Sequence, residues 1–288
     1  MLFRSQLAYL GTGLLGSAFV EAAAKRGEQI TVWNRTASKA RALEAFGARV
    51  AATPADAVRG ATCVHLVLKD DDVVDDVIAA LRPGLAAAAI IMDHSTTQPA
   101  RTASRSRRLN AEGVRYLHCP VFIGPAAARA GKGTVLSSGP RELFDARKAE
   151  LAGMAERLEY FGERPDLAAV YKLCGNAFFI GVTGIVADVL AIARGADAAT
   201  DEAFHILDLF NAAAVIAARG KTMMSGDFTP AFELSMARKD VRLMIETADT
   251  VPLASLPGIA ARMDALIAEG HGEEDLTVLG AESALASR

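Results

Sequence analysis

Three glycines near the start of the chain have the spacing of a phosphate-binding turn. The run consists of Gly11, Thr12, Gly13, Leu14, Leu15 and Gly16, in the pattern G-x-G-x-x-G. It follows a short apolar segment and precedes about ten residues of helical pattern, the context in which such a turn binds a dinucleotide. The first glycine permits a tight turn, the second lets the backbone approach a pyrophosphate, and the third lets the helix pack closely on the strand. This context favours dinucleotide binding over a purely structural glycine turn.

The residues after the second predicted strand indicate which dinucleotide binds. An NAD site usually places a carboxylate there to bind the ribose 2′-hydroxyl group. This chain has Asn34, Arg35 and Thr36 instead, with Lys39 one helical turn later. A guanidinium, a hydroxyl and an ammonium would hold a 2′-phosphate that a carboxylate would repel. The sequence therefore predicts NADP(H), and the alternative is that Arg35 is a solvated loop residue.

A lysine and an asparagine share one face of a predicted long helix. Lys172 lies between apolar residues in the first turns, and Asn176 follows one turn later. Reaction at a nicotinamide needs a proton donor near the reacting carbon, and an ammonium here could protonate the alkoxide as hydride arrives. Asn176 could hold the substrate or orient the lysine. On the residues alone, an equal alternative is a lysine whose stem packs at a domain boundary while its charge reaches water.

Three loops follow predicted strands, where a doubly wound sheet binds its ligand. They read Leu68-Lys69-Asp70, Asp93-His94-Ser95-Thr96-Thr97 and Cys119-Pro120-Val121-Phe122-Ile123-Gly124. We expect Leu68, Lys69 and Thr96 to contact the cofactor, and Ser95, Val121, Phe122, Ile123 and Gly124 to line the substrate pocket.

The other histidines and arginines of this region are predicted to be structural. His94 has no carboxylate partner in the neighbouring sequence, and His65 lies in an apolar strand. The cluster of Arg101, Arg105, Arg107 and Arg108 has the pattern of a solvated helix face. The spacings of metal sites and of a serine nucleophile elbow are absent, so no metal is predicted.

Helix and strand patterns alternate up to about residue 163, and helical patterns alone follow. We expect strands near residues 7–10, 30–33, 62–68, 89–93, 114–117, 134–138 and 158–161, and later helices near 165–194, 200–217, 234–248 and 256–269. Such alternation is typical of a mostly parallel, doubly wound sheet. The sequence therefore predicts an α/β Rossmann-type domain over residues 1–163 and an all-α domain over residues 164–288, joined by a long helix.

Composition indicates a compact protein that has no general attraction to nucleic acid. The 288 residues are 51% hydrophobic and carry a net charge of −3. Cys63, Cys119 and Cys174 are widely spaced, which is typical of reduced core thiols in a cytosolic protein. We expect no signal peptide before the first strand, and the most apolar segment, residues 176–192, is predicted to be a buried helix rather than a membrane span. We therefore expect a cytoplasmic protein with no membrane partner.

Taken together, the motifs resemble the β-hydroxyacid dehydrogenase family, the group of 3-hydroxyisobutyrate dehydrogenase and the glyoxylate and succinic semialdehyde reductases. The resemblance covers nearly the whole chain, in order. It rests on YLGTGLLGSAFV from Tyr9, on VWNRTASKA from Val32, on MDHSTTQP from Met92, on YKLCGN from Tyr171, on ADVLAIARGAD from Ala187 and on LSMARKDVRLM from Leu234. Imine reductases are a related group.

The resemblance implies an NADP(H)-dependent oxidoreductase that acts on a small aldehyde, semialdehyde or β-hydroxyacid. Lys172 would be the catalytic residue, Asn176 would act beside it, and Lys239 would approach the nicotinamide. A homodimer or homotetramer is implied as well, in agreement with the apolar helical domain.

Two segments depart from the family pattern. The substrate loop usually reads PVSGG, and here Phe122 and Ile123 replace the serine and the first glycine. The helix start, residues 166–172, lacks both usual glycines. We therefore expect weak binding of 3-hydroxyisobutyrate and better acceptance of a bulkier, less polar substrate. Lys172 argues against imine reduction, since imine reductases generally have another residue there. An imine reductase-like enzyme and a non-catalytic NADPH-binding protein stay open as alternatives.

Overall fold

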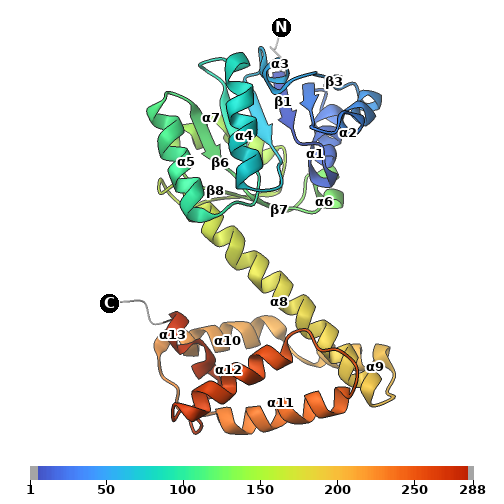
Figure 1. Cartoon of the computed structure of the whole chain (residues 1–288), viewed down its shortest axis with the longest axis vertical. Helices are drawn as coiled ribbons and strands as arrows, with labels where there is room; N and C mark the ends of the chain where they lie inside the picture. Colours follow the sequence, from blue (N-terminus) through green and yellow to red (C-terminus); the bar gives the residue numbers. More distant parts are fainter. Residues whose placement is uncertain (1–5, 285–288) are drawn as a thin grey trace. The chain divides into compact units, whose positions relative to one another are not determined.

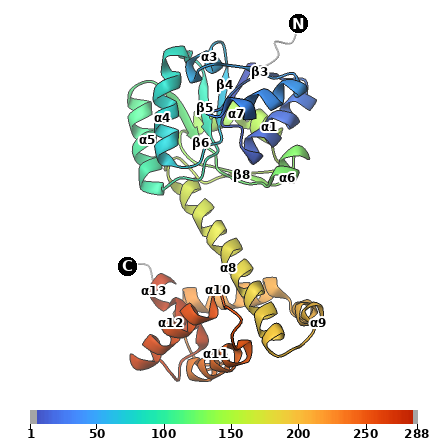
Figure 2. The same cartoon turned by 45° about the vertical axis from the view of Figure 1, so that its right-hand side comes forward.

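The computed structural model describes residues 6–284, which divide into two compact units (Figures 1 and 2). The units are Met1–Asn176 and Ala177–Arg288, and helix α8 (Leu167–Gly195) runs across the division. This division falls after the predicted boundary at residues 163 and 164, because the first turn of α8 packs within the N-terminal unit: Ala168 and Ala169 are buried there. The expectation that no signal peptide precedes the first strand rests on residues 1–4, which lie outside the described residues.

The N-terminal unit is built on a parallel sheet, as predicted, and this sheet has six strands, including the unpredicted β3. Its strands are β1 (Gln6–Leu10), β2 (Gln29–Trp33), β3 (Arg49–Val50), β4 (Cys63–Leu66), β5 (Ile90–Asp93) and β6 (Arg115–His118), in the spatial order β3-β2-β1-β4-β5-β6. The strand order reverses between β1 and β4: β2 and β3 lie on one side of β1, and β4, β5 and β6 lie on the other. Ligands of doubly wound sheets bind at such a reversal, beyond the carboxyl ends of the strands.

Helices cover both faces of this sheet (Figure 1). They are α1 (Leu14–Lys25), α2 (Ala37–Arg41) with the 3₁₀ turn η1 (Ala42–Phe46), α3 (Pro54–Val58), α4 (Asp71–Leu81) with η2 (Arg82–Gly84), α5 (Pro99–Ala111) and α7 (Arg141–Ala152). Along β1, Leu7 and Tyr9 face a core shared with α1 and α7, whereas Ala8 and Leu10 face a core shared with α3 and α4. This alternation explains why the strands of a sheet that is covered on both sides read as continuous apolar runs.

A second, three-stranded sheet completes the unit and differs from the prediction. It contains β7 (Val121–Phe122), β8 (Thr134–Ser137) and β9 (Arg157–Tyr160), with α6 (Pro125–Arg129) between β7 and β8. We expected residues 134–138 and 158–161 to extend the main sheet. Pro120 follows β6 and has no N–H to donate to a ladder, so β6 ends there. Residues 121 and 122 then pair antiparallel with β8, which leaves the main sheet.

The C-terminal unit is helical throughout its described residues. It contains the last turns of α8, α9 (Thr200–His205), η3 (Ile206–Leu209), α10 (Ala212–Ser225), α11 (Leu234–Ala248), α12 (Leu256–Ala268), η4 (Leu276–Gly280) and α13 (Ala281–Ala284). The single helix predicted over residues 200–217 is wrong. The chain breaks at Phe210, and the Asn211 side chain accepts a hydrogen bond from the Ala214 N–H to begin α10.

Helix α8 differs from the expectation that the apolar segment of residues 176–192 is a buried helix rather than a membrane span. Its 29 residues are long and apolar enough to cross a membrane, and its most apolar 18-residue stretch has a mean hydropathy of 1.9. Only 17% of that stretch is buried, so α8 is not the buried helix we expected. The helices of residues 200–209 and 212–225 pass the test together but are bent by 62°. Length and composition are weak grounds for a membrane span, because a core helix of a soluble protein passes the same test. Cys174, predicted to be a core thiol, is exposed on α8.

The C-terminal half of α8 packs within its own unit through small and polar residues. The buried Asp188 carboxylate accepts hydrogen bonds from the N–H groups of Ala254, Ser255 and Leu256, at the start of α12. A Cβ on Gly195 would lie 2.2 Å from the Thr247 carbonyl oxygen. These contacts fix α8 against α11 and α12.

Candidate cofactor and substrate site

The glycine turn after β1 has the geometry that dinucleotide binding requires. Gly11 has a φ of +98°, and a Cβ there would lie 2.2 Å from the Val67 carbonyl oxygen. A Cβ on Gly16 would lie 2.0 Å from the Gly11 carbonyl oxygen. Gly13 has no atom within 4 Å of its Cβ position. The outer glycines thus permit close backbone packing, while the space beside Gly13 stays open for a pyrophosphate at the N-terminus of α1.

Asn34 and Thr12 join the turn to the end of β2. The side-chain oxygen of Asn34 accepts a hydrogen bond of 3.0 Å from the Thr12 N–H. The side-chain amide nitrogen of Asn34 donates to the Thr36 backbone carbonyl. Among the described residues the buried Thr12 hydroxyl has no partner.

A cleft of about 760 Å³ opens beside the turn. Its lining includes Gly11, Gly13, Leu14, Leu15, Gly16, Asn34, Arg35, Thr36, Lys39, Leu68, Lys69, Ser95 and Thr96. The structure therefore brings the predicted cofactor residues together, apart from the inward-facing Thr12 and Lys239. Lys239 belongs to the C-terminal unit, where its ammonium lies 2.8 Å from the Asp240 carboxylate.

The cations at the end of β2 are available to a ligand. Arg35 and Lys39 are exposed and line the cleft, and within residues 6–284 neither side chain has a hydrogen-bond or ion-pair partner. Lys69 differs, because its ammonium lies 3.5 Å from the Asp70 carboxylate. The unpaired guanidinium and ammonium suit a phosphate group near Thr36.

Hydrogen bonds fix the loops that border the cleft. The Ser95 hydroxyl accepts a hydrogen bond of 3.0 Å from the Leu68 N–H, which ties the loop after β5 to the loop after β4. The buried Asp93 carboxylate accepts hydrogen bonds from the Ser95 N–H and the Tyr116 hydroxyl. Ser95, which we expected to line the substrate pocket, thus lies in the cofactor cleft and holds its wall.

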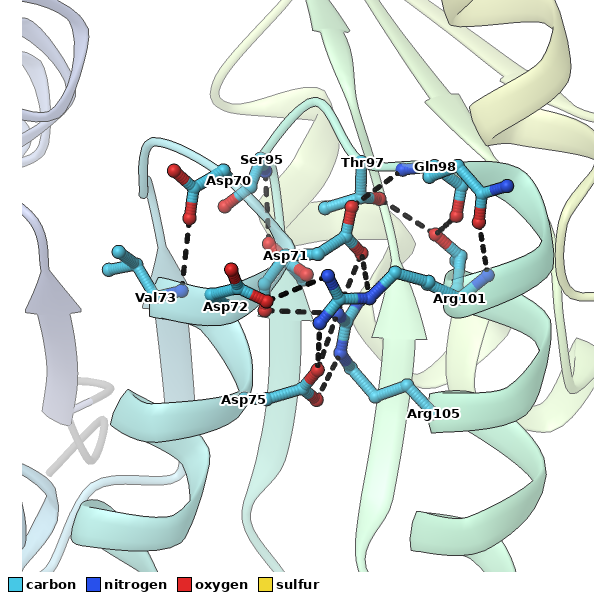
Figure 3. A network of polar contacts seen from close by, with 12 residues as sticks. Asp70, Asp71, Asp72, Val73, Asp75, Ser95, Thr97, Gln98, Arg101 and Arg105 are labelled. Atoms are coloured by element: carbon cyan, nitrogen blue, oxygen red, sulfur yellow. Dashed lines mark hydrogen bonds and ion pairs between the residues drawn. The ribbon is translucent and has the colours of Figure 1, made fainter.

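An ion-pair network locks the two helices that follow these loops (Figure 3). The guanidinium of Arg105 is buried and lies 2.8 Å from the carboxylates of both Asp71 and Asp75. Arg101 pairs with Asp75 at 3.2 Å, and the Asp71 carboxylate also accepts a hydrogen bond from the Gln98 N–H. The prediction of a solvated arginine face is wrong for Arg105, because α4 supplies its partners from about 30 residues earlier in the chain.

Lys172 lies on α8 in the same unit as the cleft, and its ammonium lies 4.3 Å from the centre of the Phe122 ring. A Cβ on Gly175 would lie 2.2 Å from that ring, so Phe122 fits against the helix only because residue 175 is glycine. Glycine inside a helix costs about 1 kcal/mol relative to alanine, which the contact with Phe122 explains. Burial lowers the pKa of the Lys172 ammonium. Asn176 is partly buried one turn further along α8.

The other residues of the predicted substrate loop face different surroundings. Val121 is buried in the core beneath the sheet, whereas Ile123 packs against Gly133. Gly124 is the N-cap residue of α6. Of the four residues of this loop that we expected to line the substrate pocket, Phe122 is the one that the structure places against Lys172.

One buried polar cluster was not foreseen. The His65 ring hydrogen-bonds both the His94 ring, at 2.9 Å, and the Glu150 carboxylate, at 2.8 Å. His65 is a buried residue, as expected, but His94 reaches a carboxylate through it. Cys63, His65 and Glu150 also have ligand atoms within 4.8 Å of one another. We assign no metal site, because the ligand atoms of His65 and Glu150 are already used in hydrogen bonds. The partners lie on α7 and β4, so no spacing in the sequence signals the cluster.

Two family models match the chain consecutively. Residues 6–162 match the NAD-binding domain of 6-phosphogluconate dehydrogenase, and residues 167–280 match the domain described as NAD-binding of NADP-dependent 3-hydroxyisobutyrate dehydrogenase. The chain belongs to the family defined by the NAD-binding domain of 6-phosphogluconate dehydrogenase, whose model matches more than half of its residues. The resemblance to β-hydroxyacid dehydrogenases is confirmed.

Individual relatives of this family member are distant. The 3-sulfolactaldehyde reductase of Escherichia coli is 25% identical over 285 residues, which cover 95% of this chain and 94% of the reductase. The cytokine-like nuclear factor N-PAC of Gallus gallus is 27% identical over 254 residues, which cover 85% of this chain and 45% of N-PAC. The chain therefore spans less than half the length of N-PAC.

Solved structures share the fold of the whole chain. A reductive aminase from Aspergillus terreus, solved with NADPH4, cyclohexanone and allyl amine, is 23% identical with a TM-score of 0.86 and coverage of 96% and 98%. An imine reductase from Myxococcus stipitatus, solved with NADP⁺, is 20% identical with the same TM-score and coverage. The predicted fold, a Rossmann-type domain followed by a helical domain, is confirmed.

Proposed function

We propose that the protein is an NADP(H)-dependent reductase or dehydrogenase that interconverts the carbonyl and alcohol groups of a small aldehyde, semialdehyde or β-hydroxyacid. A bound nicotinamide would supply or accept the hydride. The observation that carries the proposal is Lys172, a half-buried ammonium in the unit that holds the dinucleotide cleft. Within residues 6–284 it has no carboxylate partner. An ammonium without a carboxylate partner, whose pKa is lowered by burial, is suited to proton transfer.

Lys172 would act as general acid in reduction and as general base in oxidation. In reduction its ammonium donates a proton to the oxygen that becomes the alcohol, and in oxidation the neutral amine accepts the hydroxyl proton. Because burial lowers its pKa, the neutral amine is accessible at a lower pH than for a solvated lysine. Asn176, on the same helix face, would orient the substrate oxygen or the lysine.

The side chains after β2 support NADP(H) over NAD(H). Arg35 and Lys39 are unpaired within the described residues, Thr36 adds a hydroxyl, and Asn34 stands where NAD sites usually have a carboxylate. The solved relatives bound to NADPH4 and NADP⁺ agree with this choice. Lys239 stays a predicted cofactor contact.

Phe122 supports a substrate with an apolar group in place of a carboxylate. The aromatic ring covers Lys172 on one side, at the position where the family loop usually offers a serine hydroxyl. It presents an apolar surface and no hydrogen-bond donor to the substrate. A compact β-hydroxyacid would therefore find less to bind its carboxylate than a bulkier carbonyl compound would find to bury.

Restoring the serine should shift the substrate preference. The Phe122→Ser variant is expected to lower the KM for succinic semialdehyde and 3-hydroxyisobutyrate roughly 10-fold, since a hydrogen bond to a charged group contributes about 1.5–3 kcal/mol. The KM for an aromatic aldehyde should rise. Steady-state kinetics measure these effects, with NADPH for the aldehydes and with NADP⁺ for 3-hydroxyisobutyrate. Phe46→Ser, a matched change at a half-exposed ring outside the cleft, serves as the control. Full activity of the unaltered protein on 3-hydroxyisobutyrate would contradict this role of Phe122.

A substrate panel tests the proposed function as a whole. NADPH consumption would be followed with glyoxylate, with succinic, methylmalonic and tartronic semialdehydes, with 3-sulfolactaldehyde, with aromatic aldehydes and with a cyclic imine. Turnover of a carbonyl compound supports the proposal. Turnover of the imine alone would favour an imine reductase. NADPH binding without turnover of any member would favour a non-catalytic role and overturn the proposal.

We further propose that the protein is a homodimer or homotetramer with helices in its interface. Large apolar side chains are exposed along the helices of residues 171–244, among them Ile180 at 72%, Leu209 at 68% and Met224 at 72%. Monomeric proteins rarely expose so many apolar side chains on one segment, and such surfaces usually mark interfaces. Closed symmetric assemblies are the commonest oligomers.

Light scattering tests the assembly. At micromolar concentration the protein should have at least twice the mass of one chain, which is 30.2 kDa. Ile180→Lys should shift the population toward the monomer, whereas Phe46→Lys, on the N-terminal unit, should not. A monomeric unaltered protein would contradict the proposal.

A further inference from the structure

A chain of hydrogen bonds crosses the interior of the N-terminal unit. It begins at Glu150 on α7, passes through the rings of His65 on β4 and His94 after β5, and ends at the Cys119 carbonyl oxygen after β6. The three successive distances are 2.8 Å, 2.9 Å and 2.8 Å. Both histidines are buried, and the Tyr9 ring stacks on the His65 ring at 4.2 Å. The rings are therefore held rigidly in the core.

The Cys119 carbonyl determines where the protons lie along this hydrogen-bond chain. A carbonyl only accepts, so His94 must carry its proton on Nδ1 and leave Nε2 as an acceptor. His65 must then donate from Nδ1 to that atom. Its Nε2 faces the Glu150 carboxylate, another acceptor, so one further proton has to lie between them. The chain is complete only when His65 and Glu150 share that proton.

The surrounding groups agree with this arrangement. Burial, followed by the neighbouring His65, lowers the pKa of His94 to about 3, so His94 stays neutral. Burial opposes ionisation of Glu150, but hydrogen bonding to His65 and the charge of Arg147 outweigh it and lower its pKa. The other titratable groups that face the chain are Tyr9, Cys63, Cys119 and His118, with Arg26 and Glu28 beyond Tyr9. The thiols and the Tyr9 phenol are buried and have raised pKa values, so they stay neutral.

The last group of the hydrogen-bond chain, the Cys119 carbonyl, lies at the start of the substrate loop. The Cys119 N–H donates to the Asp93 carbonyl, and the Pro120 carbonyl accepts from the Leu136 N–H. Two residues later Phe122 lies against Gly175 with the Lys172 ammonium over its ring. The Cys119 carbonyl is thus the point at which a buried polar chain meets the segment that places Phe122.

We infer that Glu150, His65 and His94 form a proton-sharing positioning chain that fixes the Cys119 carbonyl and thereby the placement of Phe122 beneath Lys172. This inference rests on the proposed function, in which Phe122 and Lys172 border the substrate. A buried ion pair is weak grounds for stability, because apolar residues of similar volume often replace one without loss. A role in holding the loop explains why this interior carries polar side chains.

Two substitutions at Glu150 separate geometry from charge. In Glu150→Gln the amide can donate to His65 Nε2, so the chain is completed by neutral groups. In Glu150→Leu, His65 Nε2 loses its partner and the chain is broken at its first link. Glu142→Leu, at an exposed position on the same helix, is the matched control. Glu150→Leu should lower kcat/KM for the carbonyl substrate roughly 10–100-fold through misplacement of the loop. Glu150→Gln and Glu142→Leu should stay within about twofold of the unaltered protein, by the same reasoning.

Readouts other than turnover show whether positioning is the cause. The Kd for NADPH should be the same in all variants. The ε-methylene protons of Lys172 should be shifted upfield by the Phe122 ring current in the unaltered protein and in Glu150→Gln, and should move downfield in Glu150→Leu. ¹⁵N NMR of the unaltered protein should show His94 protonated on Nδ1 alone, a measurement that needs no variant to fold.

Different failures have different meanings. A Glu150→Leu variant with unchanged kcat/KM and unchanged Lys172 shifts would overturn the inference, as would a His94 ring protonated on Nε2. A Glu150→Gln variant as impaired as Glu150→Leu would contradict the completed neutral chain. If the unaltered protein reduces no substrate, the proposed function fails, and the NMR measurements still decide whether the chain positions Phe122.

Discussion

Replacing Lys172 by alanine is expected to lower the rate of the chemical step by about 10²–10⁴-fold, which is the usual contribution of a positioned general acid. The affinity for NADPH should stay close to unchanged, because within the N-terminal unit Lys172 does not line the dinucleotide cleft. Thermal stability should also change little, since burial disfavours the charged form of this side chain. Single-turnover kinetics, fluorescence titration with NADPH and thermal unfolding of the same sample measure the three quantities.

A second variant distinguishes catalysis from packing. Lys172→Met keeps an apolar stem of similar length and removes the ammonium, so it should lose as much rate as Lys172→Ala. If Lys172 merely packs its stem, the methionine variant would keep its turnover and the alanine variant would lose stability instead. The unaltered enzyme should also lose reductase rate as the pH rises through the lowered pKa of Lys172, because the proton donor is then neutral. A pH-independent reductase rate would argue against the lysine as donor.

Replacing Arg35 by aspartate is expected to raise the Kd for NADPH roughly 10–100-fold. The change removes charge-assisted hydrogen bonds to a 2′-phosphate, each about 1.5–3 kcal/mol, and places a repelling carboxylate there. The Kd for NADH should stay the same or fall, since a carboxylate can accept from the ribose 2′-hydroxyl. Titration of both cofactors measures the ratio.

Arg41→Asp is the matched control for this prediction. It makes the same change of net charge on an exposed residue of α2, the helix that carries Lys39, and lies outside the cleft. It should leave both affinities unchanged, apart from a small salt-dependent effect. Equal affinities of the unaltered protein for NADPH and NADH would contradict the role given to Arg35.

Features that depend on neighbouring residues could be predicted from the sequence. The turn from Gly11 to Gly16 and the cations at Arg35 and Lys39 each lie within one strand–turn–helix segment. Backbone sterics, helix capping and the period of apolar residues act over a few residues, so the printed order is enough to predict them. For the same reason the alternation of elements up to about residue 163 predicted a Rossmann-type sheet.

The tertiary structure decided the features that depend on residues far apart in the chain. Phe122 meets Lys172 and Gly175 about 50 positions later, Arg105 finds its acids about 30 positions earlier, and Glu150 reaches His65 across 85 positions. No periodicity links such residues, because they are brought together when helices pack on the sheet. Sequence reasoning therefore treated Arg105 as solvated and His94 as unpartnered.

The helices of the C-terminal region also show which features local sequence can predict and which it cannot. Apolar spacing predicted the helices, yet it did not predict the break at Phe210 or that α8 leaves most of its apolar window uncovered. A helix forms from local hydrogen bonds, whereas the surface that covers it comes from other parts of the chain or from another molecule. The sequence therefore determined which segments are helices and which residues could do chemistry, and the tertiary structure decided which of those residues meet.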